Sequence, residues 1–452
     1  MHDYPYPPGS RVAIVGGGIS GLLTARLLCD DWDVHVFEAG SYPGGHSNTV
    51  EVEVGGERYP LDTGFMVFNE RTYPNFIRLL EWLEVPSRAS DMSFGVACER
   101  SGLEYEGSSL AGVFAQWSNL GNLSFLRMLW DVLRFNREAY AKSLQLSDAA
   151  TLREFVASEG YSSSFVDWYL VPMGAAIWSA RPRDFLDFPA RFIIGFFENH
   201  GLLQVSDHIP WQTIAGGSRV YVDKLIAPFR NRVRLQTPIA SILRDAEGVT
   251  IVPANGRAER FDAVVLATHA DQSLAMLADA DPLEREILGA FPYQENEAVL
   301  HRDENLLPRL PAARASWNYR IPADAERPVT VTYDLARLQG HRSTEPLLLT
   351  LNDASAVDPS KVLRRITYHH PVFGPASPAA QRRWNEINGV RRTYFCGAYW
   401  GNGFHEDGVN SALAVGRLWG KRLESCKAVS MKDSCDTADW KPSPMNSATV
   451  ST

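Results

Sequence analysis

The apolar positions near the start of the chain change from a continuous run to a helical spacing. Residues 12–15 are all apolar, as in a strand buried within a parallel sheet. Three glycines follow, and apolar residues then recur over residues 19–28, which predicts a helix. A second short strand is predicted over residues 33–37. The chain is therefore expected to begin with a strand, a helix and a second strand.

The glycines between the first strand and the helix have the G-x-G-x-x-G spacing of a nucleotide-binding turn. Gly16 would make the tight turn and Gly18 would let a pyrophosphate approach the backbone. Gly21 would let the helix pack closely on the strand. The first helical residues, Ile19 and Ser20, would present free N–H groups and the positive end of the helix dipole to the phosphates.

An acidic residue at the end of the second strand supports the same interpretation. Glu38 follows Gly21 by 17 residues, close to the spacing at which a carboxylate accepts hydrogen bonds from a ribose hydroxyl. By itself Glu38 could be a solvated strand end. Together, the turn and the carboxylate favour a dinucleotide, which could be FAD or NAD.

The residues after Glu38 favour FAD. Ala39 follows directly, and the glycine pair Gly44-Gly45 precedes His46. This arrangement resembles the flavin-binding signature of the amine oxidase and phytoene desaturase superfamily, in which an arginine is usual at the position of His46. NAD as the sole cofactor is the alternative.

Three further segments resemble the same superfamily. Residues 61–65 resemble its next block and include Thr63, Gly64 and Phe65. An apolar strand over residues 261–268 ends at Ala267 and Thr268, where the resemblance implies an approach to the dinucleotide. A strand near the C-terminus runs into Gly397, which begins the last signature.

A helix is expected after the last signature, from near Val409 to about Leu423. The resemblance implies that its N-terminus points at the pyrimidine end of the flavin, where its dipole stabilises negative charge. Gly408, Val409 and Asn410 are the candidates for backbone contact there. The family usually has an acidic residue directly after the glycine that matches Gly397, whereas this chain has Ala398.

The resemblance implies an α/β fold with a Rossmann-like FAD-binding domain, built on a parallel sheet of amine oxidase type and interleaved with an α+β substrate domain. The FAD-binding domain is expected to take residues 1–86, 206–289 and 389–425. The substrate domain is expected to take residues 87–205 and 290–388. The polar residues 426–452 are expected to form a disordered tail.

Composition and charge narrow the classes of partner. The 452 residues carry a net charge of −9 and contain no basic run, which argues against nucleic acid. Five scattered cysteines without a C-x-x-C pair favour a reducing compartment, with no disulfide framework and no metal site. No signal segment or 18-residue apolar stretch is present, so a cytoplasmic protein is expected.

One segment leaves contact with the inner face of a membrane open. Leu123, Leu126, Trp130 and Leu133 recur at helical spacing with arginines between them. A core helix is the simpler interpretation. The alternative is a helix that lies in a lipid interface, with its arginines at the headgroups.

Finer motifs resemble a bacterial subgroup of predicted NAD/FAD-binding proteins that often occur beside methyltransferases similar to cyclopropane-fatty-acid synthase. These motifs are residues 173–179, 199–203, 216–218, 317–319 and 404–408. The resemblance implies a hydrophobic substrate of lipid or fatty-acyl type, and a methyltransferase as a potential partner. Oxidation or desaturation would proceed by hydride transfer to flavin N5, in a dry pocket that the protein supplies.

Desaturation also removes a proton, so a base is expected near the flavin. His405 and Glu406 are candidates because their loop is expected at the flavin, and His301 is a third candidate on a predicted strand. His369 and His370, within residues 368–371, are further candidate bases. A structural role is the alternative for each.

Other activities stay open. Amine oxidation ranks lower, because Gly408 stands about where monoamine oxidases place an aromatic ring against the flavin. A redox-neutral flavin isomerase and a protein that merely holds FAD are further alternatives. Cys396 could attach flavin covalently, although a buried strand cysteine is the simpler interpretation.

Overall fold

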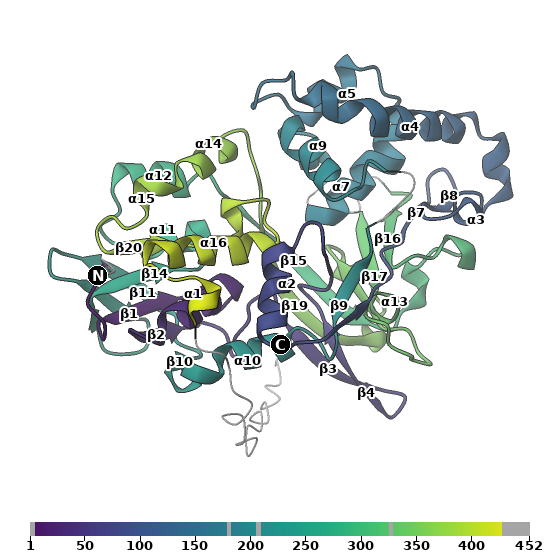
Figure 1. Ribbon diagram of the computed structural model, residues 1–452. Coiled ribbons are helices and arrows are strands. Elements are labelled where there is room, and N and C mark those ends of the chain that lie inside the picture. Colours follow the sequence, from purple (N-terminus) through teal and green to yellow (C-terminus); the bar gives the residue numbers. More distant parts are fainter. Residues whose placement is uncertain (1–4, 179–181, 205–208, 325–328, 427–452) are drawn as a thin grey trace, which may run out of the picture.

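The computed structural model describes residues 5–178, 182–204, 209–324 and 329–426, which form two domains (Figure 1). A five-stranded parallel sheet of order β10-β2-β1-β14-β20 forms the centre of the first domain. Its strands are β1 (Arg11–Val15), β2 (Asp33–Phe37), β10 (Val233–Arg234), β14 (Ala263–Leu266) and β20 (Thr393–Phe395). The strand–helix–strand unit predicted at the start of the chain is present, with β1 paired to both β2 and β14.

Helix α1 (Ile19–Leu28) is enclosed on all sides, and each of its residues is buried. Helices α16 (His405–Leu418) and α10 (Arg219–Ile226) pack against it, and α2 (Pro74–Trp82) packs against α16. A Cβ on Gly416 would lie 2.7 Å from the Leu27 side chain. The two central helices therefore approach each other as closely as a glycine allows.

Helix α16 begins earlier than the sequence predicted. Its expected start was near Val409, whereas the helix runs from His405 to Leu418. The Asp407 carboxylate accepts a hydrogen bond from the backbone N–H of Phe404 at 2.9 Å, which stabilises an earlier first turn. Gly420, with a φ of 67°, lies in the left-handed region just beyond the end of the helix.

The second domain contains a seven-stranded sheet of order β19-β15-β18-β17-β16-β7-β8, in which only β16 and β7 pair in parallel. Its strands are β7 (Phe94–Cys98), β8 (Leu103–Glu106), β15 (Tyr293–His301), β16 (Trp317–Ile321), β17 (Thr330–Asp334), β18 (Leu348–Leu351) and β19 (Val362–Pro371). The combination of this sheet with helices confirms the predicted α/β class with an additional α+β domain.

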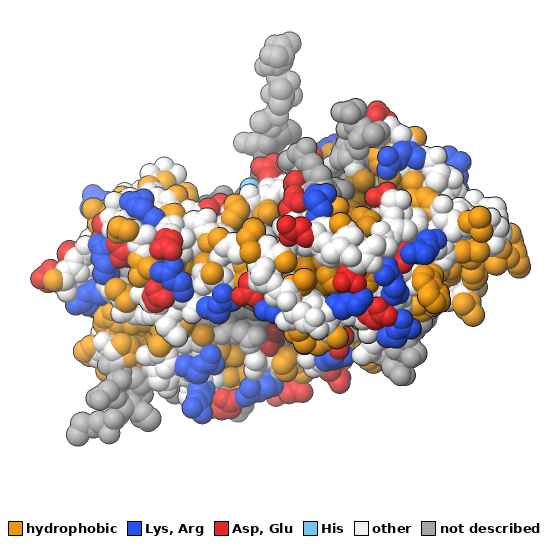
Figure 2. Space-filling view, turned by 90° about the horizontal axis from the view of Figure 1, so that it is seen from above, with side chains coloured by type: hydrophobic (Ala, Val, Ile, Leu, Met, Phe, Trp, Pro, Cys, Tyr) orange, Lys and Arg blue, Asp and Glu red, His pale blue; other side chains and the backbone are white. Residues whose placement is uncertain are grey.

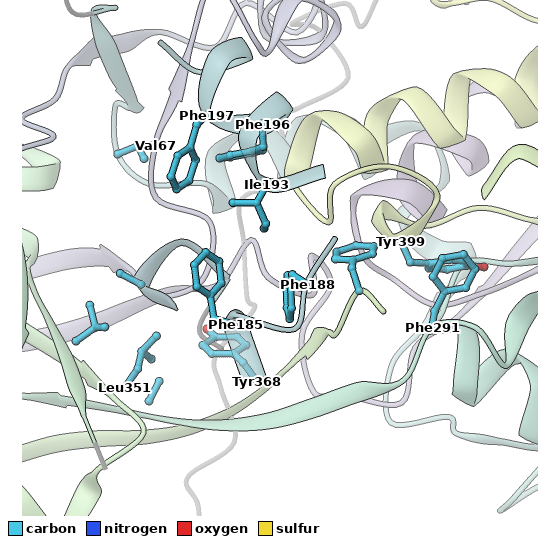
Figure 3. Packing of buried hydrophobic residues seen from close by; sticks show 14 of the residues in the cluster. Val67, Phe185, Phe188, Ile193, Phe196, Phe197, Phe291, Leu351, Tyr368 and Tyr399 are labelled. Carbon is cyan, nitrogen blue, oxygen red and sulfur yellow. The ribbon is translucent and has the colours of Figure 1, made fainter. Parts of the chain in front are cut away.

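A group of helices covers one end of this sheet (Figure 1). It includes α4 (Leu123–Ser143), α5 (Leu152–Ser158), α7 (Val171–Trp178) and α9 (Ala190–Asn199). Buried aromatic side chains join these helices to the rest of the molecule, and Figure 3 shows Phe188, Ile193 and Phe196 near Tyr399. One hydrophobic core therefore extends from the helical group to the end of β20.

The simpler interpretation of α4 as a core helix is wrong for one of its faces. The helix buries Phe125, Met128 and Phe135. Leu123 and Trp130, which the apolar spacing had placed in the core, are 81% and 58% exposed. The spacing identified the helix, but α4 carries apolar residues on two faces and only one of them packs on the protein.

Across the described ranges, none of the helices combines the length and hydropathy needed to cross a bilayer. The predicted tail lies outside the described residues except for Cys426. The exact boundaries of the two domains stay predictions.

Candidate functional site

A cavity of about 780 Å³ lies between the two domains. The C-terminal ends of four parallel strands reach it through Gly16 after β1, Glu38 after β2, Ala267 after β14 and Gly397 after β20. In open α/β sheets ligands bind at this edge, where the direction of the strand order reverses. The substrate sheet and helix α9 supply the opposite wall.

The glycine turn leaves room for a group in the cavity. Gly16 has a φ of 110°, and a Cβ there would lie 2.6 Å from the carbonyl oxygen of Ala267. A Cβ on Gly18 would meet no atom within 4 Å. The backbone of Gly18, at the N-terminus of α1, is therefore accessible from the cavity, as a pyrophosphate requires.

The loop over residues 39–46 packs beside the turn. The N–H of Gly44 donates to the carbonyl of Gly17 at 2.7 Å. The Glu38 carboxylate accepts from the N–H groups of Gly17 at 2.7 Å and Gly40 at 2.6 Å. Because a carboxylate has about four acceptor positions, Glu38 is fixed in place and retains acceptors for a ribose.

Two histidines on the cavity wall carry polar atoms without a partner. His46 Nε2 and His269 Nδ1 are buried and make no hydrogen bond in the structure. The His46 ring stacks on Tyr368 at 4.9 Å, and the His269 ring stacks on Tyr293 at 4.2 Å. Since buried polar atoms rarely stay unpaired, a bound group with polar edges fits this wall, and FAD has such edges.

Other residues predicted to contact FAD also line the cavity. The Thr63 hydroxyl bonds the hydroxyl of Tyr368 at 2.8 Å. The Phe65 ring stacks on His405 with a centroid distance of 3.8 Å. The predicted cofactor residues that line the cavity are Gly16, Gly18, Ile19, Ser20, Glu38, Ala39, Gly44, Gly45, His46, Thr63, Gly64, Phe65, Ala267, Thr268 and Gly397. Gly21 lies behind the turn, where a Cβ would collide with the carbonyl of Gly16.

The three residues predicted at the flavin end of α16 do not line the cavity. The early start of the helix brings Gly403, Phe404 and His405 to the wall instead. Gly408 packs on α1 and accepts a hydrogen bond from the Ser20 hydroxyl through its carbonyl. Val409 is in the core and Asn410 is exposed.

Of the five proposed bases, His369, His370 and His405 line the cavity, and His405 is the one at the start of α16. Its Nε2 lies 2.8 Å from the hydroxyl of Tyr221, which also bonds Ser47. Burial lowers the pKa of His405 to about 3. The imidazole is therefore neutral at pH 7 and a weak base, better suited to positioning than to proton removal.

The structure places Glu406 and His301 away from the cavity, which corrects both candidates. The Glu406 carboxylate accepts from the N–H groups of Asn75 at 3.0 Å and Phe76 at 2.8 Å, at the start of α2. His301 bonds the Thr350 hydroxyl at 2.7 Å within the substrate sheet. Each is bonded to a neighbouring element, and neither lines the cavity.

The histidines of the cavity wall are more numerous than the sequence indicated. His269 directly follows Ala267 and Thr268, which were predicted to approach the dinucleotide. Its position beside this strand end was a signal in the sequence that it lies at the site. It lies 6.0 Å from His369, ring to ring, and His46 lies 5.1 Å from His370. His370 Nδ1 is 2.8 Å from the side-chain nitrogen of Asn296.

Stability should depend on pH through these histidines. Burial lowers the pKa of His46 and His269 to about 4 and that of His370 and His405 to about 3. Because histidine titrates near 6.5 when unfolded, the unfolded chain binds more protons as pH falls below about 6.5. The free energy of unfolding should therefore fall by up to about 2–3 kcal/mol per histidine at pH of about 4.5.

Urea unfolding at pH of about 7.5 and about 4.5 measures this loss. A His269→Gln variant removes one of the titrating groups and should show a smaller difference between the two pH values. Equal stability of the unmodified protein at both pH values would contradict the expected neutrality of the cavity wall.

Away from the glycine turn and the histidines, the wall is mostly apolar. The side chains there include Met66, Met92, Phe94, Met173, Ile177, Phe196, Leu202, Trp317, Leu349 and Leu351. Among the described residues that line the cavity, Glu38 is the only carboxylate, and neither lysine nor arginine is present. Cys396 is not part of the wall, and its thiol faces Thr24 in the core.

Comparisons with known proteins agree with this architecture. A family model described as flavin containing amine oxidoreductase matches residues 19–299. No curated protein matches the chain.

Three solved structures share the fold at low sequence identity. A fatty acid isomerase from P. acnes that produces CLA has 16% identity and a TM-score of 0.65, with 90% of this chain and 98% of that chain covered. Cyclohexylamine oxidase from Brevibacterium oxydans has 17% identity and a TM-score of 0.61, with 92% and 100% covered. Putrescine oxidase bound to putrescine has 14% identity and a TM-score of 0.59, with 90% and 98% covered.

The matches confirm the predicted superfamily, the Rossmann-like domain with a substrate domain, and the choice of FAD over NAD. The model match covers more than half of the chain, and its residues include α1 and the Glu38 strand end. The chain belongs to the flavin-containing amine oxidoreductases, and this membership implies FAD as its cofactor.

Proposed function

We propose that this flavoprotein oxidises or desaturates a neutral, hydrophobic substrate of lipid or fatty-acyl type. The observation that carries the proposal is the part of the lining formed by methionine, aromatic and aliphatic side chains, which has no described charged group. An acyl chain can be desolvated there without leaving a charge unpaired. The same lining would exclude polar substrates, because their polar groups would lose water without gaining a partner there.

The protein would position the substrate beside the cofactor and exclude water from the cavity. Bound FAD supplies the hydride acceptor for such a reaction. The glycine turn and Glu38 would hold its nucleotide, and the rings of Phe65 and His405 stack beside one another on the same wall. Phe196 stacks on Phe404 at 4.8 Å and on His200 at 3.7 Å, which helps to keep water from the apolar end.

Amine oxidation is less well supported. A protonated amine would need a nearby counter-charge, and the only described carboxylate on the wall, Glu38, is held by Gly17 and Gly40 at the nucleotide end. Putrescine oxidase and cyclohexylamine oxidase share the fold alone at these identities. Their substrates are therefore weak guides to this cavity.

A redox-neutral isomerisation of an unsaturated acyl chain is the second candidate. Desaturation must pass a proton to a base, whereas the low pKa values of His46, His370 and His405 leave these imidazoles poor acceptors. Isomerisation has no net release of a proton or of electrons. The fatty acid isomerase also shares the fold alone at its identity, so this alternative rests on the cavity.

An anaerobic titration of the FAD-loaded protein with a total lipid extract tests the proposal. Loss of the visible absorption of oxidised flavin, with a lipid product lighter by two hydrogen atoms, is expected. A product of unchanged mass with a new double-bond position would favour the isomerase. Oxidation of cyclohexylamine or putrescine with peroxide release, and no reaction with lipid, would overturn the proposal.

A charge placed on the apolar wall should abolish lipid turnover. Met92 lines the cavity from a loop and is partly accessible. Met92→Asp should lower the rate of flavin reduction by lipid at least tenfold, because a buried unpaired carboxylate repels the acyl chain by a few kcal/mol. Stopped-flow absorbance measures the rate.

Met92→Leu is the matched control and should retain the rate within about threefold, since volume-conserving apolar exchanges cost little. Both variants should bind FAD normally, because Met92 lies on the apolar wall. An unchanged rate in Met92→Asp would place the substrate elsewhere.

A further inference from the structure

A continuous segment of the substrate domain exposes large apolar side chains to solvent. It comprises α3 (Leu110–Val113), η1 (Trp117–Gly121) and the first half of α4. Its exposed members, which we call the α4 surface, are Leu110, Trp117, Leu120, Leu123, Leu126, Trp130 and Leu133, each 38–81% exposed. Figure 2 shows hydrophobic side chains gathered at the right-hand end of the molecule, over these elements.

The apolar area that the α4 surface exposes to solvent is large for a monomeric protein. Trp117 and Trp130 are 81% and 58% exposed, and an aromatic side chain of this size has about 250 Å² of surface, so the two expose roughly 350 Å² together. The largest apolar patch on a typical monomer is about 300–600 Å² in total. Five exposed leucines add to this area, as at a surface that binds a partner.

The helix is built to present this face rather than to bury it. On its inner face Phe125 and Phe135 are buried, and the Phe135 ring lies 6.4 Å from Phe197 of α9. Asp131, also buried, accepts hydrogen bonds from Arg127 at 3.1 Å and Arg134 at 3.0 Å. The outer leucines and tryptophans are thus held on a rigid, packed helix.

The charges around the α4 surface indicate what the partner is. Residues 107–143, which extend to the end of α4, contain three arginines and one lysine against Asp131 and Glu138, a net charge of +2. The whole chain carries −9, so the remainder carries −11. Arg137, which pairs with Glu138, is 70% exposed at the C-terminal side of the apolar residues. Arg127, which pairs with the buried Asp131, is 52% exposed among them. An anionic surface would attract this segment and repel the rest of the molecule.

We propose that the α4 surface docks on a bilayer that contains anionic phospholipid. Leucines would enter the boundary of the acyl chains, tryptophans would lie at the level of the headgroups, and Arg127 and Arg137 would meet the phosphates. A helix in this position lies on the membrane without crossing it. The proposal stands whether the substrate is a lipid or another molecule, because it depends only on the outer face.

Co-sedimentation with vesicles tests the docking of the full, FAD-loaded protein. Binding is expected to vesicles of phosphatidylglycerol and phosphatidylcholine, and weaker binding to phosphatidylcholine alone. Trp117→Ser combined with Leu123→Ser should reduce the partition coefficient at least about 100-fold, because both side chains are 81% exposed and free to enter the interface. Arg137→Gln should reduce it about fivefold on the anionic vesicles alone.

Leu243→Ser is the matched control. Leu243 is 48% exposed on β11 (Ile239–Arg244), in the parallel-sheet domain, so its loss should leave vesicle binding unchanged. Equal binding by the double variant and the unmodified protein would overturn the proposal. The unmodified protein could instead be a dimer in solution and the double variant a monomer. That result would assign the α4 surface to self-association and would also overturn the proposal.

Quenching by brominated phospholipid provides a measurement that needs no variant. Tryptophan fluorescence of the unmodified protein should fall when it meets anionic vesicles with brominated acyl chains, because Trp117 and Trp130 would lie near the bromine atoms. Unchanged emission, at a vesicle concentration that sediments an amphipathic control peptide, would contradict the docking.

Discussion

Replacement of Gly16 by alanine should leave the protein without bound flavin. A Cβ there would lie 2.6 Å from the carbonyl oxygen of Ala267, and the φ of 110° is one that alanine rarely adopts. The new Cβ would be on the turn after β1 and the carbonyl oxygen is on the backbone after β14, so the collision can be removed only by moving the backbone. A cost of about 3 kcal/mol corresponds to an affinity for FAD lower by about 100-fold.

FAD content after purification and titration of the apoprotein with FAD measure this loss. Gly9→Ala is the matched control, because Gly9 also has a positive φ, 86°, but a Cβ there would meet no atom within 4 Å. It shares the backbone strain without the collision and should retain FAD. Stoichiometric flavin in Gly16→Ala would mean that the turn does not hold the cofactor as proposed.

Glu406→Ala should lower the free energy of unfolding by about 2–4 kcal/mol and leave turnover per bound flavin within about threefold. The Glu406 carboxylate accepts from the N–H groups of Asn75 and Phe76, at the end of α2 that carries the positive pole of the helix dipole. Its removal would leave these donors buried without an acceptor. Chemical denaturation and flavin reduction kinetics on the same preparation separate the two effects.

Glu424→Ala provides the comparison on the same helix. Glu424 pairs with Arg78 of α2, but both side chains are more than half exposed, so its loss should cost less than about 1 kcal/mol. A large fall in turnover for Glu406→Ala with unchanged stability would return Glu406 to the role of a catalytic residue. The expected result is the reverse.

The sequence was a good guide wherever the chemistry depends on neighbours along the chain. The glycine turn, Glu38 at the end of β2 and the pair Gly44-Gly45 all act through local backbone geometry, so their spacing alone placed them at the cavity. Side chains whose role depends on distant partners were harder to assign. His301 is satisfied by Thr350, a partner on another strand that no spacing could reveal.

Helices α4 and α16 show the same difference between local features, which the sequence predicts, and features that depend on distant partners. The apolar period located α4 but could not tell which of its two apolar faces the molecule covers, because that depends on where α9 packs. The start of α16 was misplaced because the cap formed by Asp407 outweighs the low helix propensity of the residues before Val409. One turn of helix then decided that His405, rather than Gly408, reaches the wall.

The sequence by itself determined the nucleotide-binding turn, the parallel strands and the family, because these follow from backbone conformations that few residue types permit. The tertiary structure decided the character of the site. It brought His46, His269 and His370 to one cavity wall, placed Glu406 beneath α2, and left Leu123 and Trp130 facing solvent. Burial, pairing and exposure are properties of elements packed from distant parts of the chain, and only their assembly sets them.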